Sequence, residues 1–557
     1  MTPDQLSSTV VDVLADLERE GALTLPDGVP TKVTVERPRQ KGHGDYATNA
    51  ALQLAKKAGM PPRELATALA ERLMVADGVA DVEVAGPGFL NITVAAAAQG
   101  QVAADVVAAG EAYGRTEVLA GQRINVEFIS ANPTGPLHLG HTRWAVLGDA
   151  IGRVLDGAGA EVTREFYIND RGNQMDLFGA SLEAAAAGRE VPADGYRGEY
   201  VRDLAEQIVA ERPDIVDLPE DERLVAFREA GYALQLAEQK SQLAEFRTHF
   251  DVWFSERSLH AGDAVEAGLA KLRQEGRLYE ADGALWMRTS DFDDDKDRVL
   301  VRSNGELTYF ASDTAYYVDK RARGFDRCIY LLGADHHGYV NRLRAMAACA
   351  GDDPEQTLEV LIGQLVKVVR DGKEVRLSKR AGEIIALGDL VAEVGVDALR
   401  YTLARYPADS PLVLDIAEVT KQSNDNRVFY VQYAHARVAS LMRNAADLGV
   451  APAGEQGHDF DAALLSHEKE GELLRALAEF PRVVASAAEL REPHRVARYL
   501  EELAGTYHRF YDACRVLPRG DEEVTDLHRA RLLLVAATRT VLANGLGLLG
   551  VSAPERM

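Results

Sequence analysis

The sequence predicts an α/β protein with a doubly wound parallel sheet, preceded by a small N-terminal α/β domain and followed by an all-helical C-terminal domain. Strand and helix patterns alternate between residues 113 and 395, which is typical of doubly wound sheets. Beyond residue 396 strand patterns fade and helical patterns follow one another. Because 557 residues are too many for one hydrophobic core, we expect domains over residues 1–112, 113–395 and 396–557.

The N-terminal segment mixes helix and strand patterns. Thr2-Pro3-Asp4-Gln5 is a capping box with proline at the first helical position. The patterns after it predict a strand at 33–36, helices at 45–57 and 62–75, an extended segment at 82–94 and a linking helix at 95–109. The first helix is acidic and amphipathic, unlike a secretory signal, and no apolar run approaches membrane-spanning length. We therefore expect a cytoplasmic chain without a membrane partner.

The central segment alternates between the two kinds of pattern. Strands are predicted at 123–129, 161–168, 328–332 and 365–369, with a helix at 139–156 and a long helical insertion at about 172–266. Ligands of doubly wound sheets bind beyond the carboxyl ends of the strands. The motifs described below all follow predicted strands.

The C-terminal segment is predicted to be helical. Helices are expected at 397–400, 428–443, 470–489, 494–514 and 526–549. The basic residues of this segment are nearly all arginine, which stacks on bases and grips phosphates better than lysine does. The alternative is that each arginine is a surface ion-pair partner, as is common in helical bundles.

Composition limits the possible partners and compartments. The formal charge of −25 argues against general affinity for nucleic acid, although net charge does not describe the local face that docks. Cys328, Cys349 and Cys514 are odd in number and widely spaced, which excludes a CxxC-type zinc site and argues against a disulfide framework.

The first informative motif is His138-Leu139-Gly140-His141, between a turn-rich segment and a predicted helix. Free N–H groups at a helix start attract phosphate oxygens. The two histidines are three positions apart and point the same way on the first turn. Gly140 allows a base or phosphate to approach the backbone. The motif therefore indicates a nucleotide site.

The second motif is a basic hairpin. A strand ending at Val369, an Asp371-Gly372 turn and a returning segment deliver Ser378-Lys379-Arg380 into a loop. The basic residues are Lys367, Arg370, Lys373, Arg376, Lys379 and Arg380, against only Asp371 and Glu374. A cationic loop suits a polyphosphate leaving group. The alternative is a solvated basic hairpin.

These motifs resemble the HIGH and KMSKS motifs of class I aminoacyl-tRNA synthetases, as HLGH and RLSKR. The surrounding sequence is similar to bacterial, actinobacterial-type arginyl-tRNA synthetases. The matching segments are VEFISANPTGPLHLGHTR, FYINDRGNQ, LLGADHHGY, LSKRAG, VGVDALRY and YVQYAHAR, within a similarity that spans Val33 to Arg437. Arg376 and Leu377 replace the usual lysine and methionine, and Phe429 replaces a tyrosine, with similar character in each case.

The resemblance implies a Rossmann-like catalytic domain, an N-terminal tRNA-contacting domain and a helical anticodon-binding domain. It implies that L-arginine is activated with ATP and transferred to the 3′-terminal ribose of tRNA(Arg), which releases pyrophosphate and AMP. Adenylation requires alignment and charge neutralisation rather than acid–base catalysis. Mg²⁺ would bridge the ATP phosphates, held by the nucleotide and water, and no structural metal is expected.

The resemblance also implies roles for particular residues. Catalytic roles are expected for His138, His141, Lys379 and Arg380. ATP contacts are expected at His138, Gly140, His141, Asp335, His336, Arg376, Ser378 and Lys379. Arginine contacts are expected at Glu127, Ser130, Asn132, Tyr309, Asp313 and His336, because a planar guanidinium requires carboxylates and fixed acceptors. A structural ion pair is the alternative for each acid. A metal role for His336 and His337 is less favoured, because adjacent side chains diverge.

Contacts with tRNA(Arg) are expected at Tyr46, Phe89, Asn91, Tyr433, Arg437 and Arg498. The alternative for Tyr46 and Phe89 is that they are core aromatics. We expect a monomer whose partners are tRNA(Arg), L-arginine and ATP. Two other functions remain open from sequence: a nucleotidyltransferase acting on a small metabolite, and a non-catalytic RNA-binding protein. Intact His138, His141 and Lys379 argue against the second.

Overall fold

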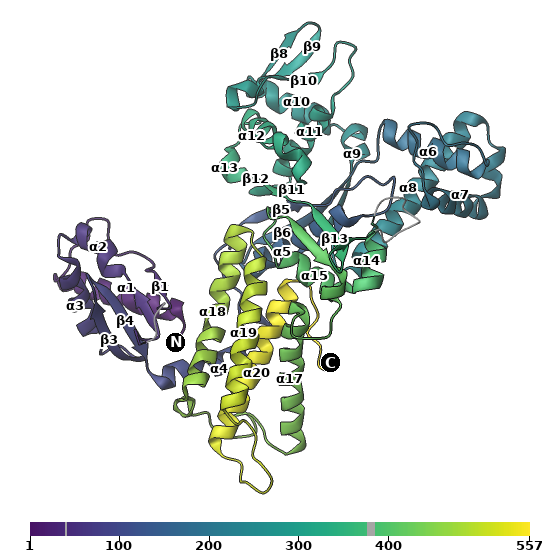
Figure 1. Ribbon diagram of the computed structural model, residues 1–557. Coiled ribbons are helices and arrows are strands. Elements are labelled where there is room, and N and C mark those ends of the chain that lie inside the picture. Colours follow the sequence, from purple (N-terminus) through teal and green to yellow (C-terminus); the bar gives the residue numbers. More distant parts are fainter. Residues whose placement is uncertain (39–41, 376–384) are drawn as a thin grey trace.

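The computed structural model describes residues 1–38, 42–375 and 385–557 (Figure 1). The N-terminal domain, in purple, stands to one side of a long helical bundle, in green and yellow. The parallel sheet lies at one end of the bundle, and two further lobes project from the sheet: a helical one around α6–α8 and a mixed one around β8–β10. The doubly wound α/β fold class is confirmed.

The N-terminal domain is a four-stranded antiparallel sheet, ordered β1-β2-β4-β3, covered by helices. Its elements are α1 (Pro3–Arg19), β1 (Val35–Glu36), β2 (Tyr46–Thr48), α2 (Ala50–Ala58), α3 (Pro62–Leu73), β3 (Val79–Ala85) and β4 (Phe89–Val94). The capping box at Thr2 is confirmed. The helix expected at 45–57 is wrong in its first turn, because Tyr46 and Thr48 are buried on one face of β2 and pair with β4.

The parallel sheet has the strand order β12-β11-β5-β6-β7, and all four pairings are parallel. Its strands, with the helix that follows the first of them, are β5 (Arg123–Glu127), α5 (Leu139–Gly157), β6 (Glu161–Ile168), β7 (Val252–Ser255), β11 (Arg327–Gly333) and β12 (Leu358–Gly363). The linking helix α4 (Ala96–Ala109) and the short η1 (Gly110–Ala112) precede this sheet.

Two expectations about the sheet are wrong. The segment 172–266 is not wholly helical, because β7 lies inside it and forms an edge of the sheet through pairs such as Phe166↔Trp253. The segment comprises α6 (Asn173–Ala186), α7 (Glu199–Glu211), η2 (Pro213–Asp217), α8 (Glu220–Glu245), β7, α9 (Glu256–Ala261) and the start of α10 (Ala264–Gln274). A four-residue strand is too short to show an alternating pattern.

The strand expected at 365–369 exists as β13 (Val366–Arg370), but it does not complete the parallel sheet. It lies in a separate sheet ordered β14-β13-β15, with β14 (Lys373–Glu374) and β15 (Leu412–Asp415). β15 falls in the segment expected to be all-helical. Its parallel pairing with β13, for example Val366↔Leu412, joins residues far apart in the chain, so local sequence patterns do not reveal it.

The mixed lobe contains an antiparallel sheet that the sequence did not predict. Its elements, with those that lead back to β11 and β12, are β8 (Leu278–Ala281), β9 (Ala284–Met287), η3 (Thr289–Phe292), β10 (Arg298–Val301), α11 (Tyr309–Ala322), η4 (Ala334–Tyr339), α12 (Val340–Cys349) and α13 (Pro354–Thr357). The helix α11 begins at Tyr309, and the Thr308 side chain caps it.

The C-terminal helices are present as expected. They are α14 (Leu387–Val394), α15 (Val396–Ala404), α16 (Ile416–Val419), α17 (Arg427–Asp447), η5 (Ala462–Leu464), α18 (Glu468–Leu490), α19 (His494–Ala513) and α20 (Asp526–Leu548). By length and apolar composition α20 could cross a membrane, contrary to our expectation, but Leu534, Val541 and Leu542 are fully buried inside the bundle. The bundle and the parallel sheet share one continuous hydrophobic core, whereas the N-terminal domain has its own.

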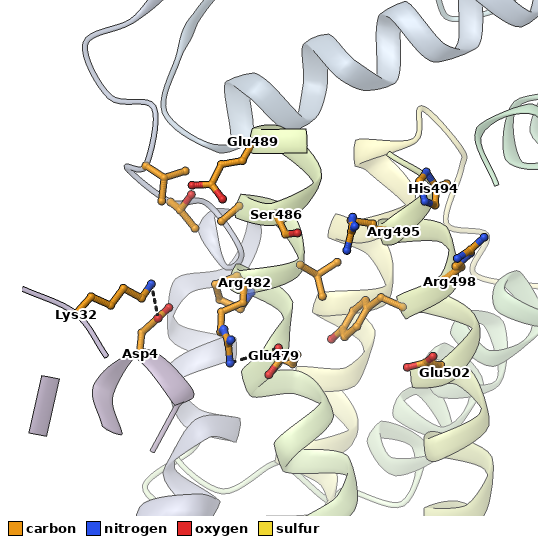
Figure 2. Close-up of a pocket in the computed structure, with 16 residues that line it drawn as sticks. Asp4, Lys32, Glu479, Arg482, Ser486, Glu489, His494, Arg495, Arg498 and Glu502 are labelled. Carbon is orange, nitrogen blue, oxygen red and sulfur yellow. Dashed lines mark ion pairs between the residues drawn. The ribbon is translucent and has the colours of Figure 1, made fainter. Parts of the chain in front are cut away.

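The N-terminal domain faces α18 and α19 across a polar cleft of about 650 Å³ (Figure 2). Arg475 of α18 forms an ion pair with Asp45 at 2.7 Å, and Arg482 donates a hydrogen bond to the Val35 carbonyl at 2.7 Å. Lys32 pairs with Asp4 inside the cleft.

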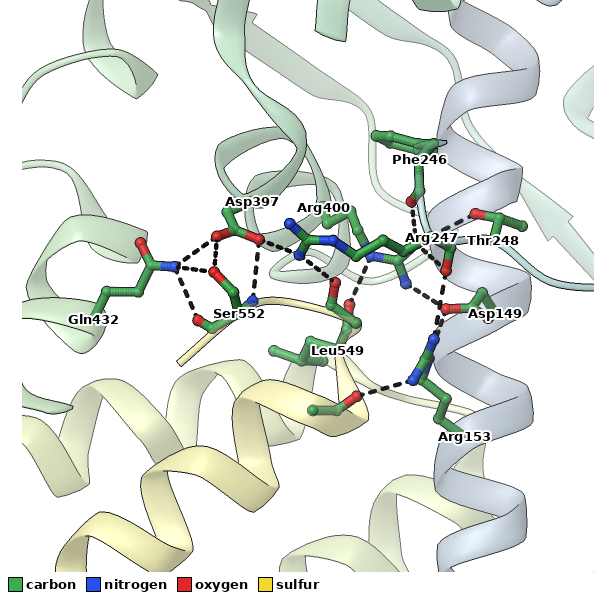
Figure 3. Close-up of polar contacts among 12 residues, drawn as sticks. Asp149, Arg153, Phe246, Arg247, Thr248, Asp397, Arg400, Gln432, Leu549 and Ser552 are labelled. Carbon is green, nitrogen blue, oxygen red and sulfur yellow. Dashed lines mark hydrogen bonds and ion pairs between the residues drawn. The ribbon is translucent and has the colours of Figure 1, made fainter. Parts of the chain in front are cut away.

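A buried polar network joins α5, α15 and the C-terminal residues (Figure 3). The fully buried Arg400 forms an ion pair with the buried Asp149 of α5 and donates to the carbonyls of Phe246 at 2.9 Å and Leu549 at 3.1 Å. The network therefore ties the end of the bundle to the helix that begins at the HLGH motif.

We expect Arg400→Leu to lower the free energy of unfolding by about 3 kcal/mol, because it leaves the buried Asp149 carboxylate with only Arg153 as a partner. Arg153→Leu is the matched control, since Arg153 binds the same carboxylate but is partly exposed, and it should cost about 1 kcal/mol or less. Urea unfolding followed by circular dichroism measures both changes. Equal losses for the two variants would contradict this account.

Candidate active site

The HLGH motif forms the N-terminus of α5 with an internally bonded pair of imidazoles. His138 is the N-cap residue; its Nδ1 accepts from the Gly140 N–H at 3.2 Å, and His141 Nδ1 accepts from the His138 N–H at 3.2 Å. The two rings stack with centroids 3.7 Å apart, which confirms that they point the same way. Because both Nδ1 atoms accept, each neutral ring carries its proton on Nε2 and can donate it to a ligand.

Burial keeps both imidazoles neutral. It lowers the pKa of His138, and it lowers the pKa of His141 to about 3, with a smaller contribution from the neighbouring His138. At neutral pH the pair therefore offers hydrogen bonds but no positive charge. Cations elsewhere must offset the charge of a bound polyphosphate.

Gly140 has a packing reason besides ligand access. A Cβ at this position would lie 3.1 Å from His138 Cε1, so a side chain would press on the imidazole ring. The glycine lets the His138 ring fold back over the first turn of α5.

The described chain that follows the basic loop is fixed at the HLGH motif. The Leu139 N–H donates to the Ile385 carbonyl at 2.9 Å, and the Leu387 N–H donates to the Leu137 carbonyl at 2.8 Å. Before the loop, the Val369↔Glu374 pair confirms the predicted hairpin as far as β14. Arg376, Leu377, Ser378, Lys379 and Arg380 lie outside the described residues.

A cavity of about 340 Å³ opens beside the carboxyl ends of β5 and β11. It brings together three of the residues expected to bind arginine, Glu127, Asp313 and His336, from β5, α11 and η4. The remaining lining is mostly aromatic and aliphatic: Tyr167, Tyr316, Tyr330, Leu332, Tyr339, Leu343 and Met346. An elongated ligand with an apolar stem and a charged end fits such a lining.

The two carboxylates of this cavity have different partners. Glu127 forms an ion pair with Lys320 at 2.6 Å and accepts from the Ser130 hydroxyl at 3.1 Å. Asp313 accepts from the Tyr339 hydroxyl, a neutral donor. Burial raises the pKa of Asp313 to about 6, against the opposing effect of the Tyr339 hydrogen bond.

Lys320 is a functional candidate that the sequence analysis missed. Its side chain is fully buried, and its ammonium lies 4.3 Å and 4.1 Å from the ring centroids of Tyr316 and Tyr330. It forms an ion pair with Glu127, whereas Asp313 is hydrogen-bonded to the neutral Tyr339 hydroxyl and is affected by Arg342 only electrostatically. The signal was available, because Asp313, Tyr316 and Lys320 recur at i, i+3 and i+7 on one face of α11.

The other expected arginine contacts lie at different distances from the cavity. The Ser130 hydroxyl accepts from the Tyr167 N–H at 3.2 Å and so lies at its edge. The Asn132 amide donates to Gln174 at 2.8 Å. Tyr309 is 74% exposed and does not line the cavity. Asp335 lies in η4 directly after β11, as expected for a residue near the sheet edge.

The expected tRNA contacts divide by exposure. Tyr46 is 1% exposed within the N-terminal core, so the alternative interpretation of a core aromatic applies to it, and its ring is not available to RNA. Asn91 is also largely buried and contacts His43. Phe89 is 42% exposed, and Arg498 is exposed at the cleft of Figure 2.

On the bundle, Tyr433 is 39% exposed and stacks on Phe429, and the Arg437 guanidinium lies 3.9 Å from the ring centroid of Tyr511. The ion-pair alternative holds for most other arginines of this segment. They are paired as Arg475–Asp45, Arg491–Glu359, Arg495–Glu492, Arg509–Glu472 and Arg515–Glu522. Within the described ranges, no group of three or more His, Cys, Asp or Glu side chains is arranged to hold a metal ion.

Three family models cover nearly the whole chain. The model described as "Arginyl tRNA synthetase N terminal domain" matches residues 4–94, "tRNA synthetases class I (R), catalytic domain" matches 104–406, and "DALR anticodon binding domain" matches 431–557. Curated arginine–tRNA ligases of Frankia alni and Kineococcus radiotolerans are 59% and 58% identical over 100% of both chains. The Thermus thermophilus arginyl-tRNA synthetase structure is 24% identical, covers 100% of both chains and has the same fold, with a TM-score of 0.74. The chain belongs to the arginyl-tRNA synthetase family.

Proposed function

We propose that this arginine–tRNA ligase binds L-arginine in the Glu127–Asp313 cavity and ATP at the HLGH motif. The arginine carboxylate attacks the α-phosphorus of ATP, pyrophosphate leaves, and arginyl-adenylate forms. The terminal ribose hydroxyl of tRNA(Arg) then attacks the aminoacyl carbonyl, and AMP leaves.

The observation that carries the proposal is the charge balance of the cavity. Lys320 forms an ion pair with Glu127, whereas Asp313 accepts a hydrogen bond from a neutral hydroxyl and is affected by Arg342 only through a small electrostatic contribution. Asp313 therefore supplies the negative charge that we assign to the guanidinium. The tyrosines that line the cavity supply flat surfaces for the guanidinium and the methylene stem of arginine. Ser130, Asn132 and His336 would contact the other end of the amino acid, whereas the exposed Tyr309 would have to turn inward to take part.

For ATP, we assign the Nε2 atoms of His138 and His141 to phosphate oxygens, with close backbone approach at Gly140 and further contacts from Asp335 and His336. Lys379, supported by Arg376, Ser378 and Arg380, would supply the positive charge that the neutral histidines lack. Mg²⁺ carried by ATP would be held by phosphate oxygens and water.

For tRNA, the contacts that we propose are the exposed Phe89, Tyr433 and Arg498 and the half-buried Arg437, because aromatic and arginine side chains stack on bases. Tyr46 and Asn91 would act only by supporting the N-terminal domain. The proposed roles are tRNA contact for residues 1–112, catalysis for 113–395 and anticodon binding for 396–557, in a cytoplasmic monomer.

Arginine-dependent exchange of pyrophosphate into ATP, with total tRNA present, tests the proposal. Exchange with arginine supports it. Exchange with ATP and another small metabolite but not with arginine would favour the nucleotidyltransferase alternative, and tRNA binding without ATP turnover would favour the RNA-binding alternative.

The pKa of Asp313 gives a pH prediction. Guanidinium binding requires the ionised carboxylate, whereas burial favours the neutral form below a pH of about 6. We expect the KM for arginine to rise about tenfold per pH unit as the pH falls below that value. Asp313→Asn should flatten the profile. A wild-type KM that does not change between pH 7 and pH 5 would remove Asp313 from guanidinium binding.

A further inference from the structure

The loop between β5 and the HLGH motif has a strained start. Ile129 and Ser130 have φ angles of 68° and 44°, in the left-handed region that non-glycine residues rarely adopt. Ile129 is β-branched, which makes this conformation still less favourable. Such a backbone persists only where the surrounding structure holds it.

Three helices of the insertion each place one side chain on this loop. From α8, Gln239 Nε2 donates to the carbonyls of Asn132 at 3.1 Å and Gly135 at 2.9 Å. From α7, the Tyr200 hydroxyl donates to the Thr134 carbonyl at 3.1 Å. From α6, Gln174 accepts from the Asn132 amide at 2.8 Å.

The buried face of α8 that includes Gln239 is polar, whereas the buried face of a helix is usually apolar. Gln235, Gln239 and Gln242 recur along α8, and the first two are 1% and 0% exposed. A buried amide costs free energy unless its hydrogen bonds are made. Gln239 uses both of its amide hydrogens on loop carbonyls. The buried Gln239 therefore stabilises the conformation of the loop rather than the packing of the insertion core.

The Asn132 side chain is oriented by the same set of contacts. Its Nδ2 group is directed to Gln174, which leaves Oδ1 to accept hydrogen bonds from a cation. An ammonium group requires an acceptor, so this orientation suits the α-ammonium of an amino acid and the reverse orientation does not.

We propose that the helical insertion α6–α8 positions the arginine-binding loop 129–135, with Gln239 and Tyr200 as its positioning residues. The proposal rests on the proposed function, in which Ser130 and Asn132 contact arginine. The HLGH segment is held separately by the bonds of Leu137 and Leu139 with Leu387 and Ile385. Loss of the insertion contacts should therefore weaken arginine binding and leave ATP binding largely unchanged.

Hydrogen exchange of the ligand-free full-length protein tests the positioning itself. We expect Gln239→Met to speed exchange of the amides between 129 and 137 by about tenfold, because methionine matches glutamine in length but donates no hydrogen bond. Gln235→Met is the matched control: Gln235 is equally buried one turn earlier, and its amide donates to Glu238 and, among the described residues, to no part of the loop. Equal exchange of these amides in both variants would overturn the proposal, whatever the enzyme's activity.

Steady-state kinetics test the consequence for the reaction. Gln239→Met should raise the KM for arginine about tenfold and change kcat and the KM for ATP less than about twofold. Its melting temperature should be close to that of Gln235→Met. Tyr200→Phe should act in the same direction. Tyr196→Phe, in the same lobe, should not, because the Tyr196 ring contacts Phe178 edge-on and, within the described chain, its hydroxyl makes no hydrogen bond to the loop. If the wild-type enzyme is active on arginine and Gln239→Met leaves the KM for arginine unchanged, the positioning proposal is overturned and the proposed function stands. A wild type inactive on arginine would overturn the proposed function, and the exchange comparison would still decide the positioning.

Discussion

Lys379→Ala should lower the rate of arginine-dependent ATP–pyrophosphate exchange by about 10²- to 10³-fold, as expected when a charge that stabilises a transition state is lost. The HLGH imidazoles are neutral, so they cannot offset the negative charge that develops on the departing pyrophosphate. A lysine of the basic loop is the candidate for that task. The loop leads to Ile385, whose carbonyl accepts from the Leu139 N–H, and to Ala386, which forms an isolated bridge with His138.

The exchange assay at saturating substrates measures this effect, with circular dichroism to confirm folding. Lys373→Ala is the control, because Lys373 is an exposed lysine of β14 in the same hairpin. It should change the rate less than about twofold. Unchanged turnover in Lys379→Ala would remove Lys379 from the mechanism.

Asp313→Asn should raise the KM for arginine by about 10²- to 10³-fold while kcat falls much less. Of the two carboxylates that line the cavity, Glu127 forms an ion pair with Lys320 and Asp313 accepts from a neutral hydroxyl, so replacement of Asp313 removes the charge that we expect to attract the guanidinium. Loss of a buried charge-assisted hydrogen bond costs on the order of 3–4 kcal/mol, which corresponds to that range.

Asp319→Asn is the matched control for Asp313→Asn. Asp319 lies on the same helix, but it pairs with Arg323 at 2.9 Å and does not line the cavity. Its replacement should leave the KM for arginine within about twofold of the wild-type value. An unaltered KM in Asp313→Asn would mean that this acid is structural.

The sequence predicts the site best where the spacing of neighbouring residues determines how their side chains are arranged. The spacing of His138 and His141 predicts two imidazoles that point the same way at a helix start, and the structure has them there, with their rings stacked. The strand β5 was predicted because apolar and polar residues alternate along it before a turn, and β11 because it is mostly apolar.

The errors lie where pairing across the chain decides the structure. β7 has four residues and gains its register only from β6, and β13 pairs with β15 instead of joining the parallel sheet. Tyr46 was expected to contact tRNA because of the motif around it. A local motif cannot show that the N-terminal core covers the tyrosine ring. Lys320 was missed because a charged residue on a helix is usually solvated, although its spacing from Asp313 and Tyr316 places it on the same face of α11, where aromatic rings cover it.

The central claim is that two distant motifs and one cavity serve a single reaction, the ligation of arginine to tRNA. Aminoacylation of total tRNA by the full-length protein, with ATP and each of the twenty radiolabelled amino acids in turn, tests it most directly. We expect ATP-dependent, acid-precipitable label with arginine and with none of the other nineteen. Stable charging with a different amino acid, and not with arginine, would contradict the assignment of the cavity and of the reaction.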